Sequence, residues 1–183
     1  MIKNLDGHLL NGPNDVFVAP NGGIYITDPY YQRDYWTRKK SELDGQKVYY
    51  IPKGTSKLII VADDLKQPNG IVGTPDGKHL FVADIDGNKT YKYTINKDGS
   101  LTDKTLFTEQ GSDGMTLDER GDVYLTSRVG VTVYGPDGKK ITVIPVAEPW
   151  TANLCFGGKN KDILFITASK AIYIMQMKVK GVE

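Results

Sequence analysis

Four asparagine or aspartate side chains recur at one position of a repeated pattern in this 183-residue chain. They are Asn14, Asn69, Asp113 and Asn153, at intervals of 55, 44 and 40 residues. Each precedes an apolar segment, and each repeat has a separate glycine-containing turn further along. A single Asn-Gly or Asp-Gly pair indicates a turn, but a turn does not explain four matched positions. Amide and carboxylate oxygens are the ligands that hard cations such as calcium prefer, so the pattern predicts a ring of oxygen ligands.

The elements that must position these residues are visible as four segments that align with one another. Each has a polar first position, an apolar strand, a turn of glycine with Asn, Asp or Lys, and a second strand. The segments are PNDVFVAPNGGIYITD (13–28), PNGIVGTPDGKHLFVAD (68–84), SDGMTLDERGDVYLTS (112–127) and TANLCFGGKNKDILFITA (151–168). A period of about 40 to 45 residues with four strands per unit is typical of propeller blades. The first strand of every blade lines the central channel, so the four residues would meet at one mouth of it.

The repeat predicts an all-β chain that forms a single β-propeller domain, or part of one, over residues 1–183. Third strands follow every hairpin, fourth strands follow in three units, and no helix of ten residues or more is expected. The last unit lacks its fourth strand, which a strand from the N-terminus could supply and so remove an exposed edge. The expected blades are residues 11–66, 67–110, 111–149 and 150–183, with residues 1–10 as a candidate closing strand.

The charge balance and the hydropathy pattern exclude several classes of partner. Lys and Arg number 23 against 22 Asp and Glu, and a net charge of +1 offers no field for nucleic acid or an anionic membrane. No apolar segment approaches the roughly 20 residues of a membrane span, and residues 1–12 lack the apolar core of a signal peptide. We therefore expect a soluble protein of the cytoplasm or periplasm. The single Cys155, between apolar neighbours in NLCFGG, cannot form an internal disulfide and is expected in the core.

An insertion, PYYQRDYWTRKKSELDGQ (29–46), makes the first repeat longer than the others. Its aromatic side chains are Tyr30, Tyr31, Tyr35 and Trp36. They either shape a substrate pocket at the channel mouth, as loops on rigid scaffolds do, or only pin the loop. Trp150 is likewise a second pocket wall or a core residue. Asp28 and Asp84 end the second strands of their blades, where they either reach the channel mouth or cap the next turn.

Together and in this order, the four segments resemble the SMP-30/gluconolactonase/LRE-like family of calcium-dependent lactonases. The likeness extends over essentially the whole chain, from about Leu10 to Gly181. The resemblance implies a six-bladed propeller, of which this chain has about four blade repeats, with the N-terminal blades of the family absent. It also implies one divalent metal in the central channel, often Ca²⁺, with Zn²⁺, Mg²⁺ or Mn²⁺ as alternatives.

The resemblance implies a role for each recurring residue. Asn69, in PNG, and Asp113, in DGM, match two of the family's metal ligands, and Asn14, in PND, would contact the metal or the substrate. Asp113 acting as base, or a water activated by the metal, would deliver the attack on the carbonyl of a sugar lactone or similar cyclic ester. The expected substrate contacts are Asn14, Asn153, Tyr30 and Trp36.

The chain departs from the family pattern at one ligand. The glutamate of the family's first blade has no matching position, and Glu109, Glu119 and Glu148 lie in strand ends or loops. From the resemblance, one expectation is a metal-dependent lactonase, which is a hydrolase of carboxylic esters. Its partner would be a small lactone. The alternative is a catalytically impaired propeller that acts as a binding or scaffold module. Unpaired blade edges would also allow two copies of the chain to form a homo-oligomer.

Overall fold

The structure is a computed structural model that describes residues 2 and 4–182. The described residues form seventeen strands and no helix. Among these residues there is accordingly no helix long and apolar enough to cross a membrane. The prediction of an all-β chain is confirmed. The expected domain limits at residues 1 and 183 lie outside the described residues.

Fifteen of these strands form four antiparallel sheets, in which strands that are consecutive in sequence pair with one another. The first sheet has β3 (Val16–Val18), β4 (Ile24–Asp28), β5 (Gln46–Ile51) and β6 (Ile59–Leu65). The second has β7 (Pro68–Gly73), β8 (His79–Asp84), β9 (Lys89–Ile95) and β10 (Leu101–Thr108). The third has β11 (Met115–Leu117), β12 (Val123–Ser127), β13 (Gly130–Tyr134) and β14 (Lys140–Pro145). The fourth has only β15 (Thr151–Gly157), β16 (Ile163–Ala168) and β17 (Ala171–Gln176).

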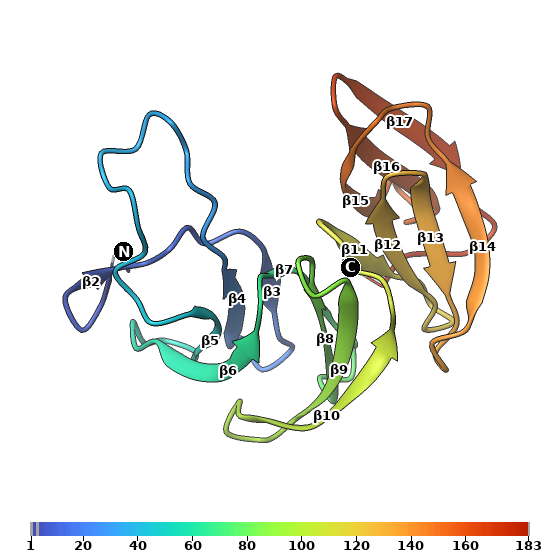
Figure 1. The fold of residues 1–183 in the computed structure, drawn as a ribbon. Coiled ribbons are helices and arrows are strands. Elements are labelled where there is room, and N and C mark those ends of the chain that lie inside the picture. Colours follow the sequence, from blue (N-terminus) through green and yellow to red (C-terminus); the bar gives the residue numbers. More distant parts are fainter. Residues whose placement is uncertain (1, 3, 183) are drawn as a thin grey trace.

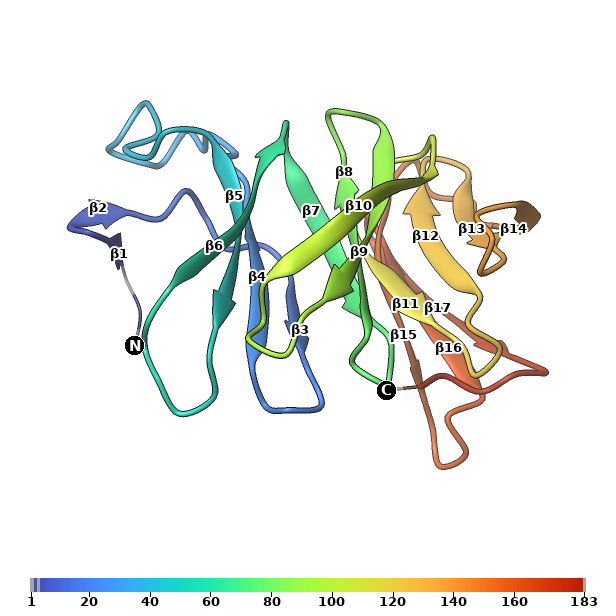
Figure 2. The same ribbon diagram turned by 90° about the horizontal axis from the view of Figure 1, so that it is seen from below.

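The four sheets lie side by side in an arc, in the order in which they occur in the chain (Figure 1). Their first strands, β3, β7, β11 and β15, are the innermost, and each contacts the first strand of the next sheet. Figure 2 shows the same sheets, turned by 90°, standing one beside another. This is the arrangement of four consecutive blades of a β-propeller.

The N-terminal segment forms a hairpin of its own, of β1 (Asn4–Leu5) and β2 (His8–Leu9). Asp6 and Gly7 have φ values of +50° and +88°, and positive φ at both central residues is the geometry of a two-residue type I′ hairpin turn. This turn makes β1 pair locally with β2 rather than with a distant strand. The hairpin lies at the opposite end of the arc from β17 (Figure 1). The closing strand expected from residues 1–10 is therefore not formed by the described residues.

Aromatic side chains fill the space between the first two blades. The rings of Tyr25 and Tyr50 lie 4.7 Å apart, and the Tyr25 hydroxyl donates to the Gly99 carbonyl at 2.9 Å. A Cβ atom on Gly99 would lie only 2.0 Å from the Tyr50 ring, and its φ is +86°. Only glycine suits this position, because it combines a left-handed conformation with close approach of a ring. Buried aromatic rings contribute large areas to a core, so this contact stabilises the first pair of blades.

Hydrogen bonds also cross from each blade to the next, close to the starts of the first strands. We call these three bonds the seam bonds. They join Thr27 Oγ1 to the Asn69 carbonyl (2.7 Å), the Gly70 N–H to the Ser112 carbonyl (3.4 Å) and Thr126 Oγ1 to the Ala152 carbonyl (3.4 Å). Each one fixes the backbone beside a recurring Asn or Asp, so the relative positions of these residues depend on how the blades pack.

Cys155 is exposed, and its prediction as a core residue is wrong. Its neighbours Leu154 and Phe156 are buried against the third blade, and successive side chains of a strand point to opposite faces. Cys155 therefore lies on the outer face of the fourth sheet, with Ile174 in register beside it across Phe165. An apolar flanking sequence does not tell which of the two faces a residue occupies.

Candidate functional site

Three of the four recurring residues line a single cavity of about 500 Å³, which we call the central cavity. Asn14 precedes β3, Asn69 lies in β7 and Asp113 precedes β11, so three consecutive blades contribute one residue each. The cavity is completed by other polar and aromatic side chains, among them Tyr31, Gln67 and Trp150. The repeat therefore predicts correctly that residues far apart in sequence converge.

Asn14 is held in place by its backbone and not by its side chain. Its N–H donates to the Thr27 carbonyl at 2.9 Å, and the Thr27 N–H donates to the Asp15 carbonyl at 3.1 Å. The Asn14 side chain is exposed and makes no hydrogen bond to any described residue. Its amide is therefore available to a ligand in the central cavity.

Asn69 is almost completely buried, at 1% exposure. Its Nδ2 donates to the Tyr31 hydroxyl at 2.7 Å, whereas its Oδ1 is buried without a hydrogen-bond partner among the described residues. Burial raises the pKa of Tyr31, and the Asp113 carboxylate raises it further, while the hydrogen bond from Asn69 opposes them. Tyr31 therefore stays protonated at neutral pH, and its position fixes the Asn69 amide with Oδ1 unused.

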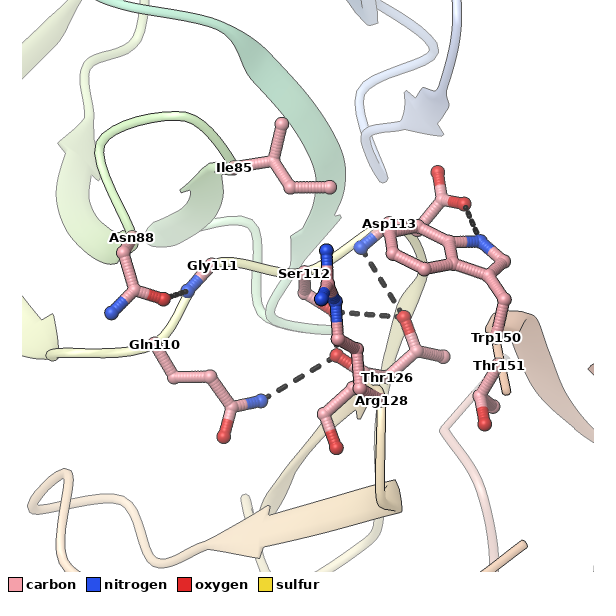
Figure 3. A pocket seen from close by; sticks show the side chains of 11 residues that line it. Ile85, Asn88, Gln110, Gly111, Ser112, Asp113, Thr126, Arg128, Trp150 and Thr151 are labelled. Carbon is pink, nitrogen blue, oxygen red and sulfur yellow. Dashed lines mark hydrogen bonds between the residues drawn. The ribbon is translucent and has the colours of Figure 1, made fainter. Parts of the chain in front are cut away.

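Asp113 is positioned by backbone contacts on both sides. Its N–H donates to Thr126 Oγ1 at 3.2 Å (Figure 3), and the Gly114 N–H donates to the same oxygen at 3.0 Å. On the other side, a Cβ atom on Gly70 would lie 2.8 Å from the Asp113 carbonyl. The glycine of PNG therefore lets the second and third blades approach. The Asp113 carboxylate receives a hydrogen bond of 3.0 Å from Trp150 Nε1.

Asn153 keeps the repeat phase but does not share the central cavity. Its N–H donates to Thr167 Oγ1 at 3.1 Å, as the N–H of Asp113 donates to Thr126 Oγ1 in the preceding blade. Its side-chain Oδ1, however, accepts the N–H of Leu154 at 2.8 Å, and Asn153 lines a separate cavity of about 260 Å³. The structure brings together three of the four recurring residues, and not all four.

Tyr30 and Trp36 pack against each other within the insertion, with ring centroids 5.8 Å apart. The guanidinium of Arg38 lies 5.5 Å from the Tyr30 ring centroid and 4.7 Å from that of Trp36, and it donates to the Leu10 carbonyl at 2.7 Å. These contacts pin the insertion to the N-terminal segment. Tyr31 is the aromatic residue of the insertion that reaches the central cavity.

Comparison with known proteins identifies the family. Residues 2–170 match the family model described as SMP-30/Gluconolactonase/LRE-like region. The chain belongs to this family. A gluconolactonase of Zymomonas mobilis is 29% identical over 198 residues, which cover 99% of this chain and 54% of the relative.

Solved structures of SMP-30/gluconolactonase/LRE-like type agree with the fold. The gluconolactonase of Xanthomonas campestris matches with a TM-score of 0.87 and 29% identity, over 96% of this chain and 60% of its own. Regucalcin of Agrobacterium tumefaciens, described as a calcium-binding protein, matches with a TM-score of 0.77 and 22% identity, over 92% of this chain and 62% of its own. The second likeness shows the fold alone. This chain thus spans little more than half of the length of these relatives.

The SMP-30/gluconolactonase/LRE-like family implies a divalent cation, and the oxygen atoms of the central cavity fit part of its ligand set. Asn69 Oδ1 is buried and unpartnered, the Asn14 amide is unbonded, and Asp113 adds a carboxylate. All three are hard oxygen donors of the kind calcium takes. Within the described residues no three His, Cys, Asp or Glu side chains gather into one group. Of the three donors only Asp113 has a negative charge. Cation affinity rises with the charge and the number of the ligands.

Asp28 and Asp84 cap the loops that lead into the family's PND and PNG segments. The Asp28 carboxylate accepts the N–H of Asn11 at 2.9 Å and that of Gly12 at 2.7 Å, and burial raises its pKa. The Asp84 carboxylate accepts three backbone N–H groups, those of Lys66, Gln67 and Gly87. Asp84 therefore caps the turn that follows β8, through Gly87, as one of the two readings expects, whereas Asp28 caps the preceding segment at Asn11 and Gly12 and not the turn after β4.

Sequence reasoning missed four residues of the central cavity, the polar Arg33, Gln67 and Asp86 and the apolar Ile85. Gln67 directly precedes the PNG segment, so its place in the repeat was a usable signal. Arg33 lies in the insertion, with its guanidinium carbon 5.8 Å from the Tyr31 ring centroid. No pattern marks an insertion residue of this kind, because its position depends on how the whole loop packs.

Proposed function

We propose that this chain carries the reactive residues of a lactone-hydrolysing site whose substrate is a sugar lactone or a similar cyclic ester. One observation carries the proposal: Asn69 Oδ1 is a buried oxygen without a protein partner, in the same cavity as Asp113 and Asn14. A buried acceptor left unpaired costs about 1–3 kcal/mol, a cost that a bound ligand removes. Relatives named gluconolactonase support the substrate class.

Asn69, Asp113 and Asn14 would hold the divalent cation of the family. Calcium is the first choice because all three residues offer hard oxygen atoms. When bound, the cation would polarise the lactone carbonyl and stabilise negative charge on its oxygen.

Asp113 is the residue of the central cavity suited to move the proton. Its carboxylate takes a proton from a water molecule as the water oxygen attacks the lactone carbonyl carbon. When the ring C–O bond breaks, the proton passes to the ring oxygen, and the product is a hydroxy acid. Trp150 Nε1 keeps the carboxylate oriented through its hydrogen bond to Oδ2. Asn14, with its unbonded amide, orients the substrate.

Replacement of the proposed base tests this function directly. Asp113→Asn keeps the size of the side chain and the acceptor for Trp150, so folding should be retained while kcat for a sugar lactone falls by about 10² to 10⁴-fold. Asp63→Asn is the matched control, because Asp63 is exposed on β6. The activity is measured with added calcium and again with a chelator. A wild-type chain that hydrolyses no lactone with calcium present would favour the scaffold alternative.

A further inference from the structure

A second cavity, of about 290 Å³, adjoins the central cavity, and we call it the side cavity. The two cavities share the side chains of Ile85, Asp113 and Trp150. Figure 3 shows Asp113 and Trp150 at one side of this space and the loop of Gln110 and Gly111 at another. A ligand that contacts Asp113 can therefore extend from the central cavity into the side cavity.

The side cavity contains an arginine without a partner. Arg128 lies in the two-residue turn between β12 and β13, which is fixed by a hydrogen bond from Ser127 Oγ to the Gly130 carbonyl at 3.0 Å. The ion pairs of the described residues are all made by lysines. The guanidinium of Arg128 makes no hydrogen bond to any described residue either. It is an exposed positive group on a short hairpin turn, in the same cavity as the proposed base.

A second unpartnered group lines the same cavity. Thr151, at the start of β15, is 1% exposed, and its Oγ1 has no hydrogen-bond partner among the described residues. The other polar side chains there are already engaged. Gln110 Oε1 accepts the Tyr134 hydroxyl at 2.9 Å, and Ser112 Oγ donates to the Gly114 carbonyl at 2.6 Å. Arg128, whose side chain is exposed, is therefore the charged donor that remains available to a ligand, whereas the Thr151 hydroxyl is buried.

We propose that the side cavity binds an oxyanion carried by the ligand, with the Arg128 guanidinium as donor. The oxyanion is a carboxylate, a sulfonate or a phosphate attached to a sugar-type lactone. This inference rests on the proposed function, since it assigns a substrate class to that site. The preferred substrate is then an anionic lactone, with its carbonyl at Asp113 and its charged substituent at Arg128.

The chemistry of this donor favours an anion over a neutral group. Guanidinium matches the geometry of carboxylate and phosphate oxygens and stays charged at every relevant pH. Asp113, the one carboxylate of the side cavity, forms no ion pair with Arg128. The positive charge is therefore not neutralised from within the protein.

Binding and turnover, measured on the same proteins, test the proposal. Calorimetry compares glucose 6-phosphate with glucose, and kinetics compare an aldonolactone with the same lactone phosphorylated on its terminal carbon. In Arg128→Gln, affinity for glucose 6-phosphate and kcat/KM for the phosphorylated lactone should each fall at least about tenfold, the usual size of a lost charged hydrogen bond. Binding of glucose and kcat/KM for the neutral lactone should change less than twofold.

Two further variants separate this effect from general ones. Arg120→Gln removes the same charge from the turn between β11 and β12, at the other end of the hairpin, and should leave all four measurements unchanged. Thr151→Val removes a buried, unpartnered hydroxyl of the same cavity at constant volume, and should leave glucose 6-phosphate binding unchanged and the melting temperature the same or higher.

The outcomes for the two proposals differ. If Arg128→Gln lowers affinity and kcat/KM equally for neutral and anionic ligands, or lowers neither, the anion site is overturned. The proposed function is retained in that case if the neutral lactone is hydrolysed. Arg128-dependent binding of glucose 6-phosphate without hydrolysis of any lactone supports the anion site and overturns the proposed function. Inorganic phosphate, added as competitor, shows whether the oxyanion alone is bound or only the oxyanion on a sugar.

Discussion

The indole N–H of Trp150 donates a 3.0 Å hydrogen bond to Oδ2 of Asp113. The two residues belong to neighbouring blades, because Asp113 precedes β11 and Trp150 precedes β15. The orientation of the proposed base is therefore set by the blade that follows its own. Without this donor, the carboxylate would keep its charge but lose one restraint on its direction.

Trp150→Phe should therefore lower kcat for lactone hydrolysis by about tenfold, since a hydrogen bond to a charged group contributes about 1.5–3 kcal/mol. The ring remains as a cavity wall, so the melting temperature should change little. Trp36→Phe is the control, because Trp36 packs within the insertion and outside the central cavity. Steady-state kinetics of the two variants decide the matter, and equal losses in both would contradict the role of the indole N–H.

Asn69→Leu should separate stability from cation binding. The substitution removes an unpaired buried oxygen, so with a chelator present the melting temperature should stay the same or rise, although the contact with Tyr31 is lost. The rise in melting temperature on adding calcium should disappear, because binding to the native state alone produces that shift. Asn11→Leu is the matched control, since the buried Asn11 amide donates to the Asp28 and Gly45 carbonyls. Asn11→Leu should lower stability by about 1–3 kcal/mol, and a comparable loss in Asn69→Leu would contradict the prediction.

Gly138 and Gly54 offer a comparison of conformational strain with steric overlap. Both have positive φ, +77° and +73°. A Cβ atom on Gly138 would lie 2.1 Å from the Phe107 carbonyl oxygen in the second blade, whereas one on Gly54 would meet nothing within 4 Å. Gly54→Ala should lower the free energy of unfolding by about 1 kcal/mol, the cost of the left-handed conformation. Gly138→Ala should lower it by about 2–4 kcal/mol, because overlap adds to that cost. Chemical denaturation measures both values, and equal losses would contradict the close approach of the two blades.

The stability of the protein should depend on Asp15 in a defined pH range. Burial raises the pKa of Asp15 above its usual value of 3.8, against the opposing hydrogen bonds from the Ile71 and Val16 N–H groups. The folded state therefore binds this proton more readily than the unfolded state. The resulting stabilisation is complete below about pH 3.8 and is lost as pH rises through the folded pKa.

Asp15→Asn removes this titration. The difference in unfolding free energy between wild type and Asp15→Asn should grow in favour of the wild type as pH falls from 7 towards 4. The other buried aspartates are present in both proteins, so their contributions cancel. Urea denaturation at several pH values provides the measurement. A difference that shrinks on acidification would show that the hydrogen bonds to Asp15 outweigh its burial.

The sequence was sufficient to predict the blades, because alternation of apolar residues and glycine-containing turns are local signals that recur four times. It was not sufficient to predict the direction of each recurring side chain. Strand pairing is irregular between Pro68 and Ile71 and again between Thr151 and Asn153. A bulge of one residue changes which face a side chain occupies. Both strands have such a bulge, so it does not by itself distinguish Asn69 from Asn153. Asn69 lies in a sheet with a blade on either side and reaches the central cavity, whereas Asn153 belongs to the last of the four described sheets and does not.

The site depends on loop packing even more than on strands. Tyr30 and Tyr31 are adjacent, and composition cannot tell which of them lines the central cavity. The stacking of Arg38 on Tyr30 and Trp36 holds that side of the insertion against the N-terminal segment, and this leaves Tyr31 to meet Asn69. Such an outcome follows from contacts between three separate segments, which no single stretch of sequence encodes.

The seam bonds have a consequence for how such propellers can be recombined. Thr27 of one blade holds the backbone of Asn69 in the next, and Thr126 holds that of Ala152. A single blade moved into another propeller would lack the hydrogen bond from the threonine of the blade that precedes it. The blade that follows it in the new propeller would likewise lose the bond to its own first strand. The smallest unit that can be transferred with this hydrogen bond intact is therefore the second strand of one blade together with the first strand of the next. Chimeras cut within the third or fourth strands should keep the site, and chimeras cut at the blade boundaries should lose it.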